Sequence, residues 1–177
     1  MNIKEQLIVE HSKANSLKIV KYIGDDAGKF EELFALFIKN EPIISQRAAF
    51  VLDHSCVQNP QLIAPHLSDL IDNMIIPNQH NSIIRSSVRV LQEYKIPEEL
   101  QGKAIEYCYL LLRDYKQPIA IRAFSISVIY NITNDFPKLK PELLLTIQDL
   151  LNDESPGLKN RSNKVYNKLK REIAQYS

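Results

Sequence analysis

The chain has 177 residues and a mass of 20.4 kDa, with 45% hydrophobic residues, 24% charged residues and a formal net charge of +1. A chain of this length can bury a sizeable core, which excludes a small scaffold that depends on disulfides or a structural metal. It contains only four glycines and no tryptophan. This composition argues against a glycine-rich phosphate loop and against a tryptophan-lined cage.

The two cysteines, Cys56 and Cys108, match no CxxC or metal-ligand spacing. We therefore expect two reduced thiols packed inside the protein. The amino-terminal segment carries Glu5 and Glu10, where a secretion signal needs an uninterrupted apolar stretch. No apolar run approaches the roughly 20 residues that span a bilayer. These features lead us to expect a cytoplasmic protein without a membrane partner.

Apolar residues recur three or four apart along most of the chain, which indicates helices. Two short helices are predicted first, at about 3–11 and 14–23, with Gly24 ending the second. The pattern then predicts helices at about 28–39, 43–58, 61–75, 81–94, 98–113, 118–134, 139–151 and 158–175. Asn59-Pro60 and Ser155-Pro156 each place a capping side chain directly before a proline, as at helix starts. Residues 125–130 alternate like a strand, but we assign them to a helix because a repeat places them on one.

The repeat joins two helices and recurs about every 38 residues along the chain. In the first helix of each repeat, four residues spaced i, i+3, i+4 and i+7 form one helix face. These sets are Phe30, Leu33, Phe34 and Phe37; Leu67, Leu70, Ile71 and Met74; Ile105, Cys108, Tyr109 and Leu112; and Leu143, Thr146, Ile147 and Leu150.

The second helix of each repeat carries a similar set of four residues. These sets are Ile44, Ala48, Val51 and Ser55; Ile83, Ser87, Val90 and Tyr94; Ile119, Ala123, Ile126 and Tyr130; and Leu158, Ser162, Val165 and Leu169. The second member is always Ala or Ser, and a small residue there lets two helices approach closely. Three repeats have an arginine just before it, at Arg47, Arg122 and Arg161, whereas the second repeat has Arg85 followed by Ser86.

A two-helix repeat of this length, with an arginine before a small residue, resembles the HEAT repeat of the HEAT/armadillo-like families. The resemblance covers about residues 28–175, and 59–67 and 118–123 are its most typical passages. It implies an all-α fold, a short right-handed α–α superhelix (solenoid) of about four helix pairs with an N-terminal cap. We expect one domain over residues 1–177, with a cap at 1–25 and repeats at about 26–59, 60–96, 97–136 and 137–177.

The resemblance also implies that each repeat arginine contacts an acidic residue in the turn before it. The candidate pairs are Glu41 with Arg47, Asp153 with Arg161 and, over a longer reach, Asp114 with Arg122. The second repeat has no acidic residue between Asn73 and Arg85, so no pair is expected there.

In HEAT-like solenoids the second helices line the concave surface, and this suggests a groove for a partner helix or peptide. Its predicted floor is Phe50, Ile121 and Val128, with Arg85 and Arg89 at the rim. Aromatic and arginine anchors are typical of protein interfaces. Alternatively, the second helix of the third repeat is apolar all round because neighbours bury both of its sides. The expected function is a non-catalytic scaffold that binds another protein.

The last 21 residues, 157–177, hold six basic residues and one acid, a local charge of +5, whereas the preceding 156 residues sum to −4. This helix offers an alternative function, nucleic-acid binding together with the groove arginines. The candidate contacts are Lys159, Lys164, Lys168 and Arg171. A solvated face on a capping helix explains the same charges. HEAT-like DNA glycosylases share the repeat architecture, but this chain has no tryptophan to take their characteristic role.

Catalytic and metal-binding patterns are weak in this sequence. The four histidines lie on different predicted elements, and none has a histidine or cysteine four residues away. His66, Asp69 and Asp72 share one side of a helix, but such a set is more typical of a solvated face than of a metal site. We therefore expect no enzyme activity, no metal, no cofactor and no small-molecule substrate.

Overall fold

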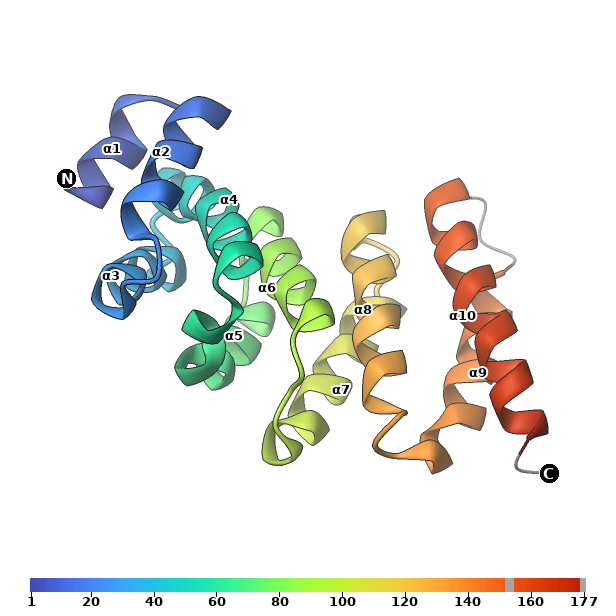
Figure 1. Ribbon diagram of the computed structural model, residues 1–177. Coiled ribbons are helices and arrows are strands. Elements are labelled where there is room, and N and C mark those ends of the chain that lie inside the picture. The colour runs from blue at the N-terminus through green and yellow to red at the C-terminus, as the bar shows by residue number, and fades with distance from the viewer. Residues whose placement is uncertain (152–154, 176–177) are drawn as a thin grey trace. The chain divides into compact units, whose positions relative to one another are not determined.

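A computed structural model describes residues 1–151 and 155–175, and these residues form helices with no strand among them (Figure 1). The helices are α1 (Ile3–Val9), α2 (Lys13–Ile23), α3 (Ala27–Ile38), α4 (Pro42–Gln58), α5 (Leu67–Asp72), α6 (Asn81–Glu93), α7 (Glu98–Arg113), α8 (Ile119–Ile132), α9 (Lys140–Leu150) and α10 (Pro156–Ala174). The predicted all-α class is confirmed, and residues 125–130 lie inside α8.

Local sequence signals explain several of the helix ends. Asn2, Ser12 and Asp26 cap α1, α2 and α3 by accepting a backbone N–H bond three residues ahead. The predicted helix over 61–75 is α5 flanked by two 3₁₀ segments, Pro60–His66 and Asn73–Ile75. Pro65 lies inside the first of these segments, where it lacks the N–H that a continuous α-helix needs.

The two predicted proline-associated caps differ in outcome. Ser155 accepts a hydrogen bond from the N–H of Leu158 at 3.4 Å, so this cap is confirmed. Asn59 makes no capping bond, and its side-chain amide donates to the carbonyl of Gly24 at 2.8 Å instead. Gly24 ends α2 with a φ of 54°, a conformation that glycine adopts without a steric penalty.

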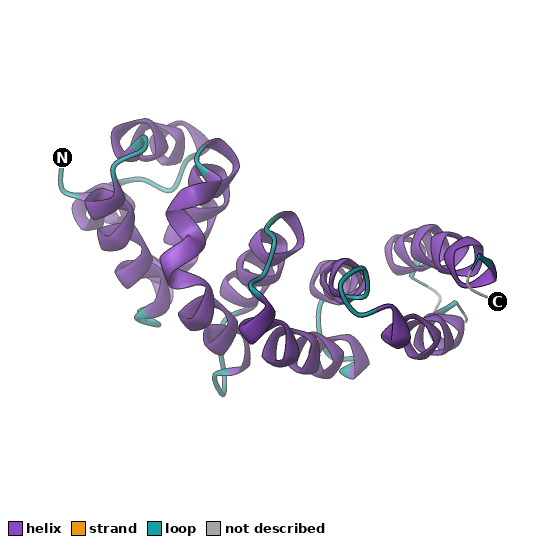
Figure 2. Cartoon of the chain, turned by 60° about the horizontal axis from the view of Figure 1, so that its bottom comes forward, coloured by secondary structure: helices purple, strands orange, loops and turns teal. Residues whose placement is uncertain are grey.

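The chain divides into two compact units, unit 1 (Met1–Val90) and unit 2 (Leu91–Ser177). In unit 1, α4 packs against α1, α2 and α3. In unit 2, α8 packs against α7 and α10, and α10 also packs against α9. Figure 2 shows the helices of each unit joined by short connections. The single domain and the right-handed superhelix concern the arrangement of the two units, and both stay predictions.

The repeated positions form the cores of the two units. The small residues of the second helices, Ala48, Ser87, Ala123 and Ser162, are all at most 9% exposed. Phe30, Leu70, Cys108 and Leu143 of the first helices are fully buried. Ile119 is the main exception, with 47% of its surface exposed, because it is the first residue of α8. The repeat pattern therefore identified the faces along which the helices pack.

Two of the repeat arginines, Arg47 and Arg122, bind helix carboxyl ends, and the expected Glu41–Arg47 pair is wrong. Arg47 donates from Nη1 to the carbonyls of Leu7 at 2.6 Å and Ile8 at 2.9 Å, in the last turn of α1. Glu41 instead pairs with Lys39 at 2.9 Å and with Lys4 at 3.4 Å. The physical reason is that last-turn carbonyls have no partner within their own helix, and α1 packs against α4.

Arg122 performs the same task in unit 2. Its Nε donates to the carbonyl of Leu112 at 3.0 Å, in the last turn of α7, and its guanidinium lies 4.9 Å from the ring centre of Tyr115. The pKa of Asp114 is lowered mainly by hydrogen bonds from Lys116 and Gln117, and the charge of Arg122 adds to this effect. The third candidate pair includes Asp153, which lies outside the described residues.

Candidate partner-binding surface

Helix α4 and the part of α6 that belongs to unit 1 carry aromatic and charged residues that we call the α4–α6 surface: Phe50, Asp53, His54, Arg85 and Arg89. Phe50 and His54 lie one turn apart on α4, and their rings stack with centres 4.1 Å apart and an interplanar angle of 25°. Both side chains are half-buried. The Nδ1 atom of His54 lies 3.2 Å from the carbonyl oxygen of Phe50, which fixes the imidazole against the helix. The stack therefore presents a preorganised aromatic edge.

An ion pair joins the two helices beside this stack. Arg89 donates from Nη1 to Oδ2 of Asp53 at 3.3 Å, and the side chains of Arg89 and Asp53 are 46% and 5% exposed. Burial raises the pKa of Asp53 to about 6, although Arg89, the Ser86 hydroxyl and Arg85 act in the opposite direction. Ser86 also donates to the carbonyl of Ala49 at 3.3 Å, a second polar contact between these helices.

Arg85 stands one turn before Arg89 on α6 and is exposed. Within the part of the chain that the structure describes, it forms no ion pair or hydrogen bond. Phe50, Arg85 and Arg89, three of the five predicted groove residues, all lie in unit 1, and Asp53, one turn after Phe50 on α4, links that helix to the two arginines through the Arg89 ion pair and the charge of Arg85. Their predicted role in partner binding stays a prediction.

The other two predicted groove residues require a correction. Ile121 and Val128 have no exposed surface, and Ser125 and Ile132 on the same side of α8 are also buried. The reason is that α8 contacts both α7 and α10 within unit 2. The alternative explanation, a helix buried by neighbours on both sides, accounts for these residues. The predicted apolar floor of Ile121 and Val128 is therefore not a surface.

The predicted anion contacts lie on α10 of unit 2. Lys164, Lys168 and Arg171 are exposed, and Lys159 is half-buried. The ammonium of Lys168 lies 5.3 Å from the ring centre of Tyr130. The structure places these cations on the side of α10 away from its buried residues, among them Leu158 and Leu169.

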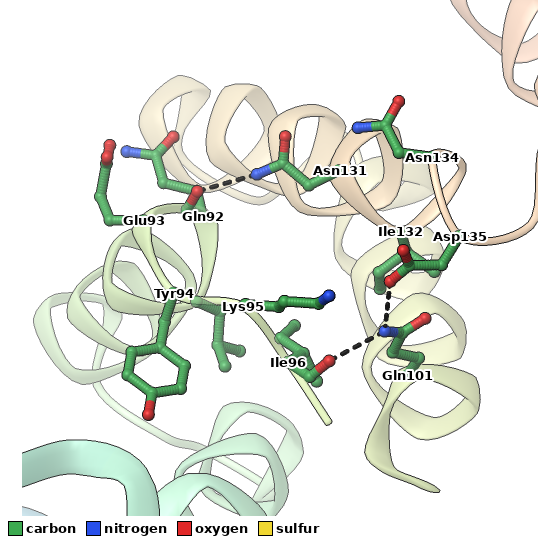
Figure 3. Close-up of a pocket in the computed structure, with 11 residues that line it drawn as sticks. Gln92, Glu93, Tyr94, Lys95, Ile96, Gln101, Asn131, Ile132, Asn134 and Asp135 are labelled. Atoms are coloured by element: carbon green, nitrogen blue, oxygen red, sulfur yellow. Dashed lines mark hydrogen bonds between the residues drawn. The ribbon is translucent and has the colours of Figure 1, made fainter. Parts of the chain in front are cut away.

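Unit 2 also contains a cavity of about 310 Å³, lined by both polar and apolar side chains, that sequence reasoning missed (Figure 3). Gln101 forms part of the wall of this cavity and is 3% exposed. Its Nε2 donates to the carbonyl of Ile96 and to Oδ2 of Asp135, both at 2.8 Å. Asn131 donates to the carbonyl of Gln92 at 2.8 Å. Lys95 extends between Asn131 and Gln101 in Figure 3. These polar residues come from three separate segments and share no spacing that could have revealed the cavity.

Comparison with known proteins agrees with the repeat. The HEAT repeat domain family matches residues 3–169. The chain belongs to the HEAT repeat family. HEAT repeats generally mediate protein–protein interactions, and the family generally provides non-catalytic scaffolds. No curated protein and no solved structure matched this HEAT protein.

The two cysteines and His66 of this HEAT protein are packed inside the fold or against other side chains. Cys56 and Cys108 are free and buried, and burial raises the pKa of each thiol to about 12, which disfavours the reactive thiolate. His66 stacks on Phe34 with ring centres 4.4 Å apart, so it serves packing. The residues that the structure describes contain no group of three His, Cys, Asp or Glu side chains suited to a metal ion. Among those residues, no helix is long and apolar enough to span a membrane.

Proposed function

We propose that this HEAT protein is a scaffold module whose α4–α6 surface binds a helix or peptide of a partner protein. The observation that carries the proposal is the Phe50–His54 stack on α4 together with the ion pair that joins the neighbouring Asp53 to Arg89 of α6. Aromatic and arginine side chains dominate binding energy in protein interfaces, where they combine a large apolar area with directed hydrogen bonds. A preformed stack also costs little conformational entropy on binding.

The charges of the surface favour an acidic partner segment. The guanidinium of Arg85 is exposed and available for a carboxylate, whereas Arg89 already faces Asp53. We infer that an apolar side chain of the partner packs against the ring stack and that a neighbouring carboxylate binds Arg85. Arg89 contributes less, since a partner carboxylate must share it with Asp53.

The proposal includes a cytoplasmic location and the absence of catalysis. The two free, buried cysteines support a reducing compartment. The alternative function is nucleic-acid binding. Because Arg89 already pairs with Asp53, the positive charge of the groove arginines that is available to a phosphate is reduced. The support for this alternative therefore rests on α10 rather than on α6.

The test begins with a display library of random peptides selected on the immobilised full chain. Enriched peptides are then measured by fluorescence anisotropy against the wild type, Phe50→Ala/Arg85→Ala and a control. We use Arg85 rather than Arg89 because removing Arg89 leaves the buried Asp53 without its partner. The control, Leu17→Ala/Lys18→Ala, removes one exposed apolar residue and one exposed cation from α2.

We expect the Phe50→Ala/Arg85→Ala variant to lose at least about tenfold in affinity, equivalent to roughly 1.4 kcal/mol. The control variant should stay within about twofold of the wild type. Circular dichroism checks that all three chains are equally helical. Enriched peptides that bind the wild type and the Phe50→Ala/Arg85→Ala variant equally well would contradict the proposal.

A further inference from the structure

The outer face of α10 carries a stripe of cations and amides without an acidic residue. This α10 stripe consists of Asn160, Asn163, Lys164, Asn167, Lys168, Lys170 and Arg171, all exposed. The opposite side of α10 is buried in unit 2 through Leu158, Ser162, Val165 and Leu169. With a rise of 1.5 Å per residue, the cations from Lys164 to Arg171 span about 10 Å.

The one acid of α10, Glu172, has both carboxylate oxygens bound to side chains of neighbouring helices in unit 2. Oε2 of Glu172 lies 2.8 Å from Nζ of Lys140, which is buried, and Oε1 accepts a hydrogen bond from the hydroxyl of Tyr130 at 2.5 Å. Both partners belong to the interior side of unit 2, on α9 and α8. Glu172 therefore pairs with a buried lysine. The charge of Lys168 also helps to lower the pKa of Glu172, so Lys168 is partly compensated, whereas Lys164, Lys170 and Arg171 have no such effect on it.

The cations of the stripe are also free of other acids. Among the described residues, Lys164, Lys168, Lys170 and Arg171 form no ion pair. Lys168 and Lys170 lie over the rings of Tyr130 and Tyr166, at 5.3 and 5.5 Å from the ring centres. Such cation–π contacts orient the side chains but leave the positive charge unneutralised.

We propose that the α10 stripe binds the phosphate backbone of nucleic acid without sequence specificity. Lysine and arginine neutralise phosphates, and asparagine amides donate hydrogen bonds to phosphate oxygens. No large apolar side chain of α10 is exposed. The stripe therefore lacks the anchors of a protein interface and the apolar face that a helix needs to bury in a membrane surface. This inference is independent of the α4–α6 surface.

The number of cations sets the expected salt dependence. Three to four neutralised phosphates give a slope of about −3 for log K against log salt on duplex DNA. Raising the salt from 50 to 200 mM then weakens binding about 60-fold. The dissociation constant at low salt should lie in the micromolar range that is typical of non-specific binding.

The test measures fluorescence anisotropy of a labelled 20-base-pair duplex and a labelled 20-nucleotide single strand at 50, 100 and 200 mM KCl. The full chain is compared with Lys164→Glu/Arg171→Glu, two exposed residues that make no side-chain hydrogen bond, ion pair or ring contact among the described residues. A neutral variant, Lys164→Gln/Arg171→Gln, separates loss of attraction from added repulsion. The matched control is Lys18→Glu/Lys21→Glu, which makes the same charge change on two exposed lysines of α2.

We expect the neutral variant to reduce the salt slope by about 2 and the Glu variant to abolish measurable binding at 100 mM KCl. The α2 control should retain binding within about threefold. Absence of wild-type binding at 50 mM KCl, or equal loss in the α2 control, overturns the proposal. Binding to phosphatidylserine vesicles or poly-glutamate but not to nucleic acid also overturns it. Phe50→Ala/Arg85→Ala should bind nucleic acid like the wild type, which separates this result from that of the peptide test.

Discussion

Arg47 in unit 1 and Arg122 in unit 2 occupy the same position in the repeat. Each donates to at least one backbone carbonyl in the last turn of a helix, but the helix differs. Arg47 binds the last turn of α1, in the predicted N-terminal cap, whereas Arg122 binds the last turn of α7, the helix just before its own. Arg47 is half-buried, and Arg122 is only 4% exposed. The repeat position therefore specifies a cation that satisfies a helix carboxyl end, and the local packing decides which helix it is.

Arg122 is more deeply buried than Arg47. We therefore expect the largest difference between the units in the stability that each arginine provides. Arg122→Ala leaves the Leu112 carbonyl without its donor in a buried site and removes the packing of the side chain, so we expect a loss of about 3 kcal/mol. Arg47→Ala should cost about 1 kcal/mol because water can reach the freed carbonyl of Ile8. Urea unfolding at pH 7 measures both losses of stability. Equal losses in the two variants would contradict the expected difference between Arg122 and Arg47.

Asp53 in unit 1 and Glu172 in unit 2 provide the second contrast, because their pKa values shift in opposite directions. Burial raises the pKa of Asp53 from 3.8 to about 6, so the folded chain binds more protons than the unfolded chain between these values. The contribution of Asp53 to stability therefore falls as the pH rises from about 4 to 6.

Asp53→Asn should remove this pH dependence. Between pH 4.5 and pH 7 the wild type should lose on the order of 2 kcal/mol of unfolding free energy through Asp53, and the variant should not show this loss. Urea unfolding at pH 4.5, 5.5, 6.5 and 7.5 measures the effect. Asp69→Asn, at an exposed position of α5, is the control and should leave the wild-type pH profile unchanged. An unchanged profile in Asp53→Asn would show that Asp53 does not titrate in this range.

Glu172 should give the smallest effect, with the opposite sign. Burial acts to raise its pKa, but the hydrogen bonds from Lys140 and Tyr130 outweigh burial and lower it below 4.5. Charged Glu172 therefore stabilises unit 2 above pH 4.5, and this stability is lost as the pH falls through its folded pKa. Glu172→Gln should cost about 1 kcal/mol at pH 7 and less at pH 4. The same urea series measures it, and a constant cost from pH 7 to pH 4 would contradict the assignment.

The sequence predicts the fold of each unit well because periodicity reports which face of a helix is buried. It predicts Ala48 and Ser162 at close helix contacts, and both are fully buried. It does not reveal the partner of Arg47, because α1 lies outside the repeat pattern. Asn59 looks like a cap, yet its amide binds Gly24 across 35 residues, a contact that only the packing of unit 1 creates.

The candidate site is less predictable for the same physical reason. The spacing of Phe50, Ile121 and Val128 identifies the side of a helix that faces away from its own repeat core. It cannot tell whether another helix covers that side, and α8 contacts α10 as well as α7. The bond between Gln101 and Asp135 joins residues 34 positions apart that share no repeat position. The sequence alone therefore does not distinguish exposed from buried residues on this side of a helix, whereas the structure does.

The central claim, that the α4–α6 surface is the partner-binding surface, is tested most directly by a ¹⁵N NMR titration of the full chain with a display-selected peptide. We expect shifts concentrated in the amides of α4 and α6 around Phe50 and Arg85, with α8 and α10 unchanged. Shifts confined to α8, α10 or the cavity of unit 2 would contradict it.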